Sequence, residues 1–359
     1  MSFSPEDLAA IDTPAVLIDL ELARRNIDRF QQYADKYGLR VRPHIKTHKL
    51  PAIAEMQLAA GAVGITCQKV SEAEAMIAGS GAITDVLITY NIVGAEKLEH
   101  LKALARKVTL SVVADSRAVV DGLSAAFRGE PQPLAVLVEC DTGANRCGVL
   151  TPEAAAALAA NIHASPGLVF GGLMTYPPAG GEAAVERFME EAKNRIEAQG
   201  IAVPVITSGG TPSMMHAAEA PVTTEYRPGT YVYNDRSLVS RGVCGWEDCA
   251  LNVLATVVSV PAPNRAIIDA GSKTLTSDLL GLAGYGHVLG RDDIAIDQLS
   301  EEHGRLVSQG AIGLAVGDKV RIVPNHACVV TNMVDAVIVK GGGGANPEKW
   351  PIVARGKIV

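Results

Sequence analysis

Short β-branched runs alternate with helix-like segments along the chain from Leu39 to about Tyr226. This alternation is typical of parallel strands joined by crossover helices. Between the runs, helices are predicted at residues 71–78, 95–106, 116–127, 152–163 and 182–199. Eight strands are predicted, near residues 39–44, 63–67, 85–90, 108–114, 134–140, 168–175, 203–208 and 222–226.

Eight β/α units with no sign of a reversal favour a closed barrel over an open doubly wound sheet. The predicted fold class is therefore α/β, with a (β/α)8 TIM-like barrel over residues 21–242. Barrels of this kind carry their chemistry at the C-terminal ends of the strands. The residues that follow each predicted strand are thus the first candidates for a site.

After about Val243 the pattern changes to strands separated by Gly, Pro and Asp turns, at 253–260, 265–269, 319–323 and 336–340. This predicts a second, mostly β domain over residues 243–359. The apolar run Pro14–Leu20 is not needed for the barrel, so residues 1–20 are assigned to the β domain as well. A chain of 359 residues exceeds the usual size of a single core, which agrees with two domains.

Charge and composition narrow the classes of function. The net charge is -7 and no basic cluster occurs, which argues against a nucleic-acid partner. No uncharged apolar stretch of about 20 residues and no basic, apolar leader are present, so we expect no membrane partner and a cytoplasmic protein. The six cysteines form no CxxC pair and are expected to remain thiols.

The segment from Arg42 to Lys49 follows the first predicted barrel strand and holds five cationic or imidazole side chains in eight residues. Composition alone is equally compatible with a solvated loop. Its position at the barrel mouth favours chemistry, because a lysine that lies beside other cations and is partly desolvated is more often the neutral amine that can attack an aldehyde. Lys46 fits this role better than Lys49 because it lies nearer the strand.

Two further strand ends supply candidates. The turn Ser208-Gly209-Gly210-Thr211 can bring backbone amides close to a phosphate, and Gly229 with Thr230 could complete that cradle after the last strand. Most Gly-Gly turns are only tight turns, but phosphate sites of barrels recur at the loops after the last two strands. Two other strand ends place Arg146 and Tyr176 at the mouth, where the alternatives are a surface ion pair and a rim aromatic.

In the β domain, Pro324-Asn325-His326-Ala327-Cys328 carries an imidazole and a thiol one residue apart. If this segment is a strand, both side chains point to the same face. Imidazole and thiolate suit zinc or a neighbouring transition metal, and two protein ligands leave positions for water and substrate. An isolated pair of this kind is usually a core cysteine beside a satisfied histidine.

Together these motifs resemble the D-threonine aldolase and D-serine dehydratase-like family of fold-type III pyridoxal-phosphate enzymes, within the alanine racemase N-terminal barrel superfamily. The resemblance covers nearly the whole chain and rests on Pro43–Lys49, Asp141–Gly148, Ser208–Thr211, Arg227–Thr230 and Pro324–Cys328. It implies that Lys46 binds pyridoxal 5'-phosphate covalently. It further implies a divalent metal (Mn, Mg or Zn) on His326 and Cys328, a small D-amino acid as substrate, and a homodimer. For the other cofactor contacts it implies Gln68, Arg146 at the pyridine nitrogen, Tyr176, and Ser208, Gly209, Gly210, Thr211, Gly229 and Thr230 at the phosphate.

The resemblance implies a lyase of β-hydroxy D-amino acids, with Lys46, His326 and Cys328 as the catalytic set. D-threonine aldolase, which gives glycine and acetaldehyde, is placed first. A dehydratase of D-serine or 3-hydroxy-D-aspartate is the alternative, because some family aldolases have an aspartate where this chain has Cys328, whereas the dehydratases have a cysteine. A metal-independent amino-acid racemase is the second alternative. A non-catalytic cofactor carrier would be expected to lack the β domain.

Overall fold

The computed structural model describes residues 3–341 and 344–359. The chain divides into two compact units. The first contains the chain up to Asp28, Thr47–Lys49 and Thr230–Gly356, and the second contains Arg29–Lys46, Leu50–Gly229 and Lys357–Val359. Throughout the described residues, every helix is too short or too polar to cross a bilayer.

The second unit is built on an eight-stranded parallel sheet in the order β2-β9-β8-β7-β6-β5-β4-β3. A parallel bridge between His44 and Thr66 joins the segments at the two ends of this order, so the sheet closes on itself. The predicted barrel is therefore confirmed. Its strands are β2 (Arg40–Val41), β3 (Ile65–Cys67), β4 (Asp85–Asn91), β5 (Thr109–Ala114), β6 (Leu134–Cys140), β7 (Leu168–Thr175), β8 (Ile206–Ser208) and β9 (Glu225–Tyr226).

One layer of the barrel core is formed by four neighbouring strands. Leu87, Val113, Leu137 and Met174 pack together, one from each of β4 to β7. Strand β6 shows why the sequence was informative here, since six of its seven residues are buried and the run is apolar up to Glu139. Such continuous runs are typical of parallel strands covered on both faces.

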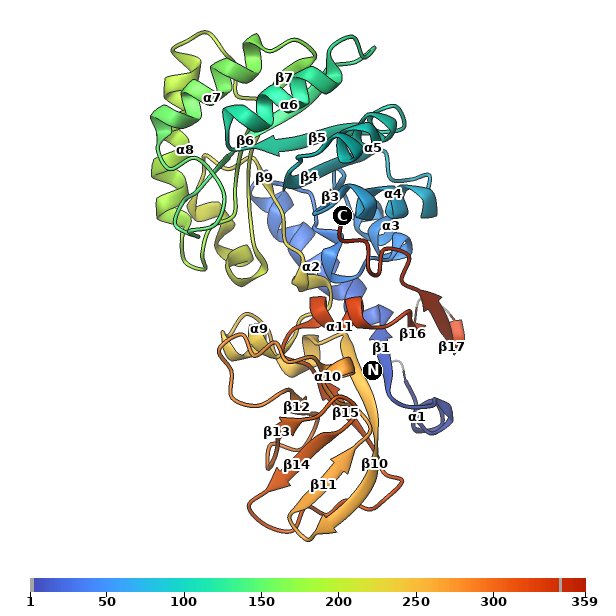
Figure 1. Ribbon diagram of the computed structural model, residues 1–359. Helices are drawn as coiled ribbons and strands as arrows, with labels where there is room; N and C mark the ends of the chain where they lie inside the picture. The colour runs from blue at the N-terminus through green and yellow to red at the C-terminus, as the bar shows by residue number, and fades with distance from the viewer. Residues whose placement is uncertain (1–2, 342–343) are drawn as a thin grey trace. The chain divides into compact units, whose positions relative to one another are not determined.

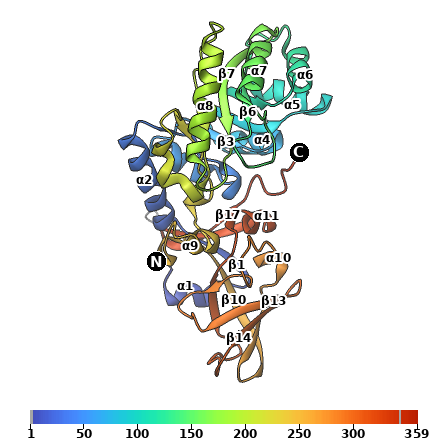
Figure 2. The same ribbon diagram turned by 90° about the vertical axis from the view of Figure 1, so that its left-hand side faces the viewer.

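Helices cover the outside of the barrel, and α7 and α8 run side by side in Figures 1 and 2. Helix α7 begins where the Thr151 side chain accepts a hydrogen bond from the amide of Ala154, with Pro152 in the first turn. The barrel helices are α3 (Pro51–Ala59), α4 (Val70–Gly79), α5 (Ala95–Ala105), α6 (Arg117–Phe127), α7 (Pro152–Ala164) and α8 (Glu182–Glu197), with the 3-10 helix η2 (Thr211–Glu219) after β8.

The first unit contains a nine-stranded sheet in the order β11-β14-β13-β12-β15-β10-β1-β16-β17. The early strand β1 (Ala15–Asp19) pairs antiparallel with β10 and parallel with β16, so the N-terminal run is part of this sheet. The other strands are β10 (Leu251–Ala262), β11 (Arg265–Ile268), β12 (His287–Val288), β13 (Ile294–Leu299), β14 (Gly304–Ser308), β15 (Lys319–Val323), β16 (Ala336–Gly341) and β17 (Gly344–Pro351).

Short helices complete the first unit and carry part of its polar chemistry. They are α1 (Pro5–Ala10), α9 (Arg236–Ser240), α10 (Ser272–Leu275) and α11 (Ala327–Met333), together with the 3-10 helices η3 (Thr230–Val232) and η4 (Trp246–Asp248). The long helix α2 (Leu20–Lys36) and the 3-10 helix η1 (Ile45–Thr47) each include residues of both units.

Candidate active site

The first candidate, Lys46, lies just beyond β2 in the 3-10 turn η1. Its backbone amide donates to Nδ1 of His44 at 3.3 Å, and its Nζ lies 5.9 Å from the centre of the Tyr176 ring. Lys49 is different: it is buried, and its ammonium donates to Oδ1 of Asn332 at 2.7 Å and to the carbonyl of Ala354 at 3.2 Å. An ammonium held by two oxygens is committed to structure, so Lys46 is the stronger candidate for an amine that reacts.

Arg42, at the start of the same cationic segment, has a structural role. Its Nε lies 3.0 Å from Glu225, and its Nη1 lies 2.6 Å from Asp85. The two carboxylates raise the pKa of Arg42 although burial alone would lower it. This ion-pair network fixes the chain where β2 ends and is not available for a substrate.

Gln68 follows β3 and connects it to two neighbours. Its Oε1 lies 3.1 Å from Nε2 of His44, and its Nε2 donates to the carbonyl of Thr89 at 2.8 Å. Because His44 also contacts the Lys46 amide, Gln68 belongs to the set of residues that shape the lysine turn.

Tyr176 is the point where the candidates of the barrel meet. Arg146 follows β6 in the chain, and its guanidinium carbon lies 4.8 Å from the centre of the Tyr176 ring. A Cβ atom built on Gly210 would lie 3.5 Å from Cε2 of Tyr176, so the glycine loop touches the same ring. The barrel therefore brings Lys46, Arg146 and Gly210 around one aromatic side chain.

The glycine loop has the geometry of a close backbone approach. Gly209 has a φ of +146°, and a Cβ there would lie 2.6 Å from the backbone nitrogen of Arg227. The next residues open η2, with Pro212 in its first turn. The amide of Gly229 donates to Oγ1 of Thr211 at 3.2 Å, which joins the two predicted halves of the cradle. Backbone amides without side chains at the start of a helix suit a phosphate group.

Glu139 is a residue that sequence reasoning did not single out. It is 4% exposed near the end of β6, and the Asn91 amide donates to it at 3.4 Å. Burial raises its pKa to about 7, opposed by the Arg146 charge and assisted by that of Asp115. A carboxylate at the end of an apolar run was the available signal. Among the described residues, ligand atoms of Asp115, Glu139 and Cys147 lie within 4.8 Å of one another, which places like charges around Glu139.

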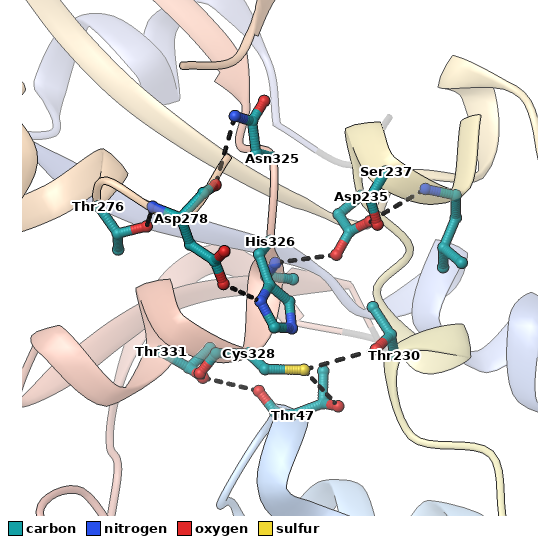
Figure 3. Close-up of polar contacts among 12 residues, drawn as sticks. Thr47, Thr230, Asp235, Ser237, Thr276, Asp278, Asn325, His326, Cys328 and Thr331 are labelled. Carbon is teal, nitrogen blue, oxygen red and sulfur yellow. Dashed lines mark hydrogen bonds and ion pairs between the residues drawn. The ribbon is translucent and has the colours of Figure 1, made fainter. Parts of the chain in front are cut away.

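The His326 and Cys328 pair lies in the first unit, where Figure 3 shows its contacts. Nδ1 of His326 lies 2.6 Å from Oδ2 of Asp278. Sγ of Cys328 lies 3.1 Å from Oγ1 of Thr47 and 3.4 Å from Oγ1 of Thr230. Burial lowers the pKa of His326, but its hydrogen bond to Cys328, the Cys328 charge and Asp278 outweigh burial and raise that pKa to about 9.

The predicted strand conformation of this pair is wrong. Strand β15 ends at Val323, His326 is the N-cap of α11, and Cys328 lies in the first turn of that helix. The side chains nevertheless meet, because an extended N-cap followed by a helical turn brings them together through a hydrogen bond. The Thr230 hydroxyl, which the sequence places among the candidate phosphate contacts, lies 3.4 Å from Sγ of Cys328.

The donor set around His326 and Cys328 fits a metal ion. One imidazole nitrogen is held by a carboxylate, which is the usual arrangement of a metal-bound histidine. The thiol has two hydroxyl neighbours that can donate to a thiolate. In the barrel, Gly209 and Gly210 likewise fit a phosphate-bearing cofactor beside Lys46.

A parallel barrel with a lysine after its first strand, joined in the chain to an antiparallel β domain, defines the alanine racemase class of fold. The model of the alanine racemase N-terminal domain matches residues 18–237, and a serine dehydratase domain matches residues 250–340. The chain belongs to the D-threonine aldolase and D-serine dehydratase-like family of fold-type III pyridoxal-phosphate enzymes and is a pyridoxal-phosphate-dependent lyase.

Individual relatives agree with this assignment. A D-threonine aldolase from Arthrobacter sp. is 36% identical, over 98% of this chain and 94% of its own. The crystal structure of a D-threonine aldolase from Filomicrobium marinum has a TM-score of 0.90 at 34% identity, over 98% of each chain. The D-threo-3-hydroxyaspartate dehydratase from Delftia sp. has a TM-score of 0.87 at 33% identity, over 96% of this chain and 98% of that one. Solved structures of D-threo-3-hydroxyaspartate dehydratase also include a histidine-to-alanine mutant and, two positions further on, a cysteine-to-alanine mutant in the metal-free form.

Proposed function

We propose that this protein is a pyridoxal-phosphate- and divalent-metal-dependent lyase of β-hydroxy D-amino acids, with D-threonine as the first substrate to test. The observation that carries the proposal is the convergence of Lys46, Arg146 and Gly210 on Tyr176. An amine, a cation and a glycine turn around one ring match the three parts of this cofactor, namely its aldehyde, its ring nitrogen and its phosphate.

The barrel residues would divide the work on the cofactor. When bound, pyridoxal phosphate supplies an aldehyde and a conjugated ring that accepts electrons from the substrate. Lys46 would attach to the aldehyde and, once released, hold or move a proton at its Nζ. Arg146 would face the ring nitrogen, and Tyr176 would lie against the ring. The Ser208–Thr211 loop would bind the phosphate through its backbone amides.

The His326 and Cys328 pair of the first unit would bind the metal of the proposed reaction, with the hydroxyls of Thr47 and Thr230 beside the sulfur. A divalent cation supplies a Lewis acid for the substrate hydroxyl. The two threonine hydroxyls would orient the Cys328 sulfur. An imidazole and a thiolate favour zinc or a neighbouring transition metal over magnesium. The solved mutants of D-threo-3-hydroxyaspartate dehydratase support this assignment.

A dehydratase is the second candidate, and Cys328 is the observation that favours it. In D-threo-3-hydroxyaspartate dehydratase, a cysteine-to-alanine mutant was solved in the metal-free form, and this cysteine comes two positions after a histidine that was also mutated. The same spacing separates His326 from Cys328. Elimination of water and cleavage of the carbon–carbon bond both begin with a substrate hydroxyl that a metal can polarise, so one site could perform either reaction.

The covalent role of Lys46 is tested by borohydride trapping. The protein is loaded with pyridoxal phosphate, reduced and digested, and the modified peptide is identified by mass. We expect the adduct on Lys46 and none in Lys46→Ala. Lys69→Ala is the matched control, because Lys69 also lies over a tyrosine of the barrel, 3.5 Å from the ring centre of Tyr90. An adduct that persists in Lys46→Ala would contradict the cofactor assignment.

The reaction is tested with metal-loaded protein and D-threonine, D-serine or 3-hydroxy-D-aspartate in separate incubations. Glycine with an aldehyde identifies an aldolase, whereas a 2-oxo acid with ammonia identifies a dehydratase. Conversion to the L-enantiomer that survives chelator would support the racemase alternative and refute the proposed metal role. The predicted homodimer can be measured on the same preparation by sedimentation.

A further inference from the structure

Asp278 holds one particular nitrogen of His326. Its Oδ2 lies 2.6 Å from Nδ1 of the imidazole, and the imidazole also makes a hydrogen bond with Cys328. In Figure 3 the carboxylate and the sulfur lie toward different nitrogens of the ring. When a carboxylate accepts a hydrogen bond from the Nδ1–H group of a neutral imidazole, the lone pair is on Nε2. Asp278 thus determines which nitrogen is available on the Cys328 side.

The segment that carries Asp278 is itself fixed by the residue next to His326. Asn325 is 1% exposed, and its side-chain amide donates to the carbonyls of Asp278 at 3.4 Å and Gly284 at 2.8 Å. Its Oδ1 accepts a hydrogen bond from Nη1 of Arg236 at 3.0 Å. The carboxylate and the imidazole are therefore tied together by one buried amide as well as by their own contact.

A second carboxylate nearby serves the backbone instead. Asp235 accepts the amide of Ala327 at 3.0 Å and the amide of Leu238 at 3.2 Å, so it caps α9 and holds the start of α11. Neither contact involves the imidazole ring. Among the aspartates around His326, it is Asp278 that the hydrogen bonds place on the ring.

We propose that Asp278 is a positioning residue for the metal, which orients His326 so that Nε2 faces the ion together with the Cys328 thiolate. This inference rests on the proposed function, because it assumes that His326 and Cys328 bind a metal. Removing a partner of this kind typically weakens metal affinity by about 10- to 100-fold.

The test measures binding of Co²⁺ to the full-length protein, without reference to activity. A cobalt–thiolate bond absorbs in the near ultraviolet, so the band reports the Cys328 ligand, and titration against a chelator gives the dissociation constant. We expect Asp278→Ala to raise this constant about 10- to 100-fold. Asp278→Asn keeps the volume and can still accept a hydrogen bond from Nδ1–H through its amide oxygen, so it should recover part of the affinity.

Asp292→Ala is the matched control. Asp292 also lies beside a histidine of the first unit, 3.6 Å from Nε2 of His287, and its removal should leave Co²⁺ binding unchanged. The far-ultraviolet circular dichroism of each variant and its borohydride adduct at Lys46 check the fold. If Asp278→Ala is unfolded, the conservative Asp278→Asn variant decides, with an expected loss of several-fold.

The two proposals can fail separately. If His326→Ala and Cys328→Ala lose Co²⁺ while both Asp278 variants bind it within twofold of the unmodified protein, the role of Asp278 is refuted and the metal site stands. If His326→Ala and Cys328→Ala bind Co²⁺ as the unmodified protein does, the metal site itself is wrong and the inference falls with it.

Discussion

Replacing Glu139 with glutamine should make the cofactor-free protein more stable at alkaline pH. The carboxyl is buried on β6, and burial raises its pKa from 4.5 to about 7, against the opposing charge of Arg146. The folded protein therefore binds this proton more tightly than the unfolded chain does. Glutamine keeps the shape and can still accept the Asn91 amide, but it cannot ionise.

The difference in proton binding between the folded and unfolded chain determines how the free energy of unfolding changes with pH. The stability contributed by the protonated group is complete below pH 4.5 and is lost as the pH rises to about 7. At about 1.4 kcal/mol for each tenfold change, the loss is on the order of 3 kcal/mol. Glu139→Gln should not show this loss, so its advantage over the unmodified protein should be small at pH 5 and near its full value at pH 8. In a unit of this size that corresponds to about 6 to 12 °C in Tm.

Thermal denaturation of both proteins at pH 5 and pH 8, without cofactor, measures the difference directly. Glu190→Gln, which removes an exposed carboxylate from α8, is the control for net charge and should change Tm little at either pH. If Glu139→Gln and the unmodified protein lose the same Tm between the two pH values, the Glu139 carboxyl is not held protonated and the reasoning is wrong.

Three further substitutions test structural roles. Arg42→Met should lower the free energy of unfolding by about 3–5 kcal/mol, because the buried Glu225 carboxylate loses its ion-pair partner. Chemical denaturation measures this loss, and a value below about 1 kcal/mol would contradict the prediction. Lys49→Met should lower Tm because the ammonium no longer bonds Asn332, yet the borohydride adduct should still form, and its disappearance would mean that the wrong lysine was assigned. Asp235→Ala should cost about 2–4 kcal/mol because a helix cap and a buried amide partner are lost, and an unchanged denaturation midpoint would contradict this.

Most of the barrel was predictable because strands β4 to β7 hold six to eight residues each, are largely apolar and are bounded by turns. The predicted bounds of the strands at Leu134–Cys140 and Leu168–Thr175 agree with β6 and β7 residue for residue. The shorter strands β2 and β9 contain two residues each, where the sequence had suggested about five. Their ends bend into the lysine turn and the last loop, which are the segments that carry candidate chemistry.

The first turn of α11 was not predictable from propensity. Three consecutive β-branched residues, Val329, Val330 and Thr331, suggest a strand, yet this segment is helical. Buried contacts override propensity here, since Oγ1 of Thr331 donates to the carbonyl of Thr47 at 2.7 Å and to that of Cys328 at 3.1 Å. The ligand types could be read from the sequence, whereas their backbone conformation depended on a residue far away in the chain.

Asp278 shows why the surroundings of a site are harder to predict than its ligands. His326 and Cys328 stand out because their chemistry is rare and their spacing is short, but the aspartate that orients His326 lies 48 residues earlier in a glycine-rich loop. Nothing in its local sequence distinguishes it from the neighbouring acids Asp292 and Asp293. The one local signal was Asn325: a side-chain amide can donate two hydrogen bonds and accept two, so its burial requires partners from another segment. A buried amide next to a suspected ligand is therefore a reason to search distant loops for the group that fixes the ligand's orientation.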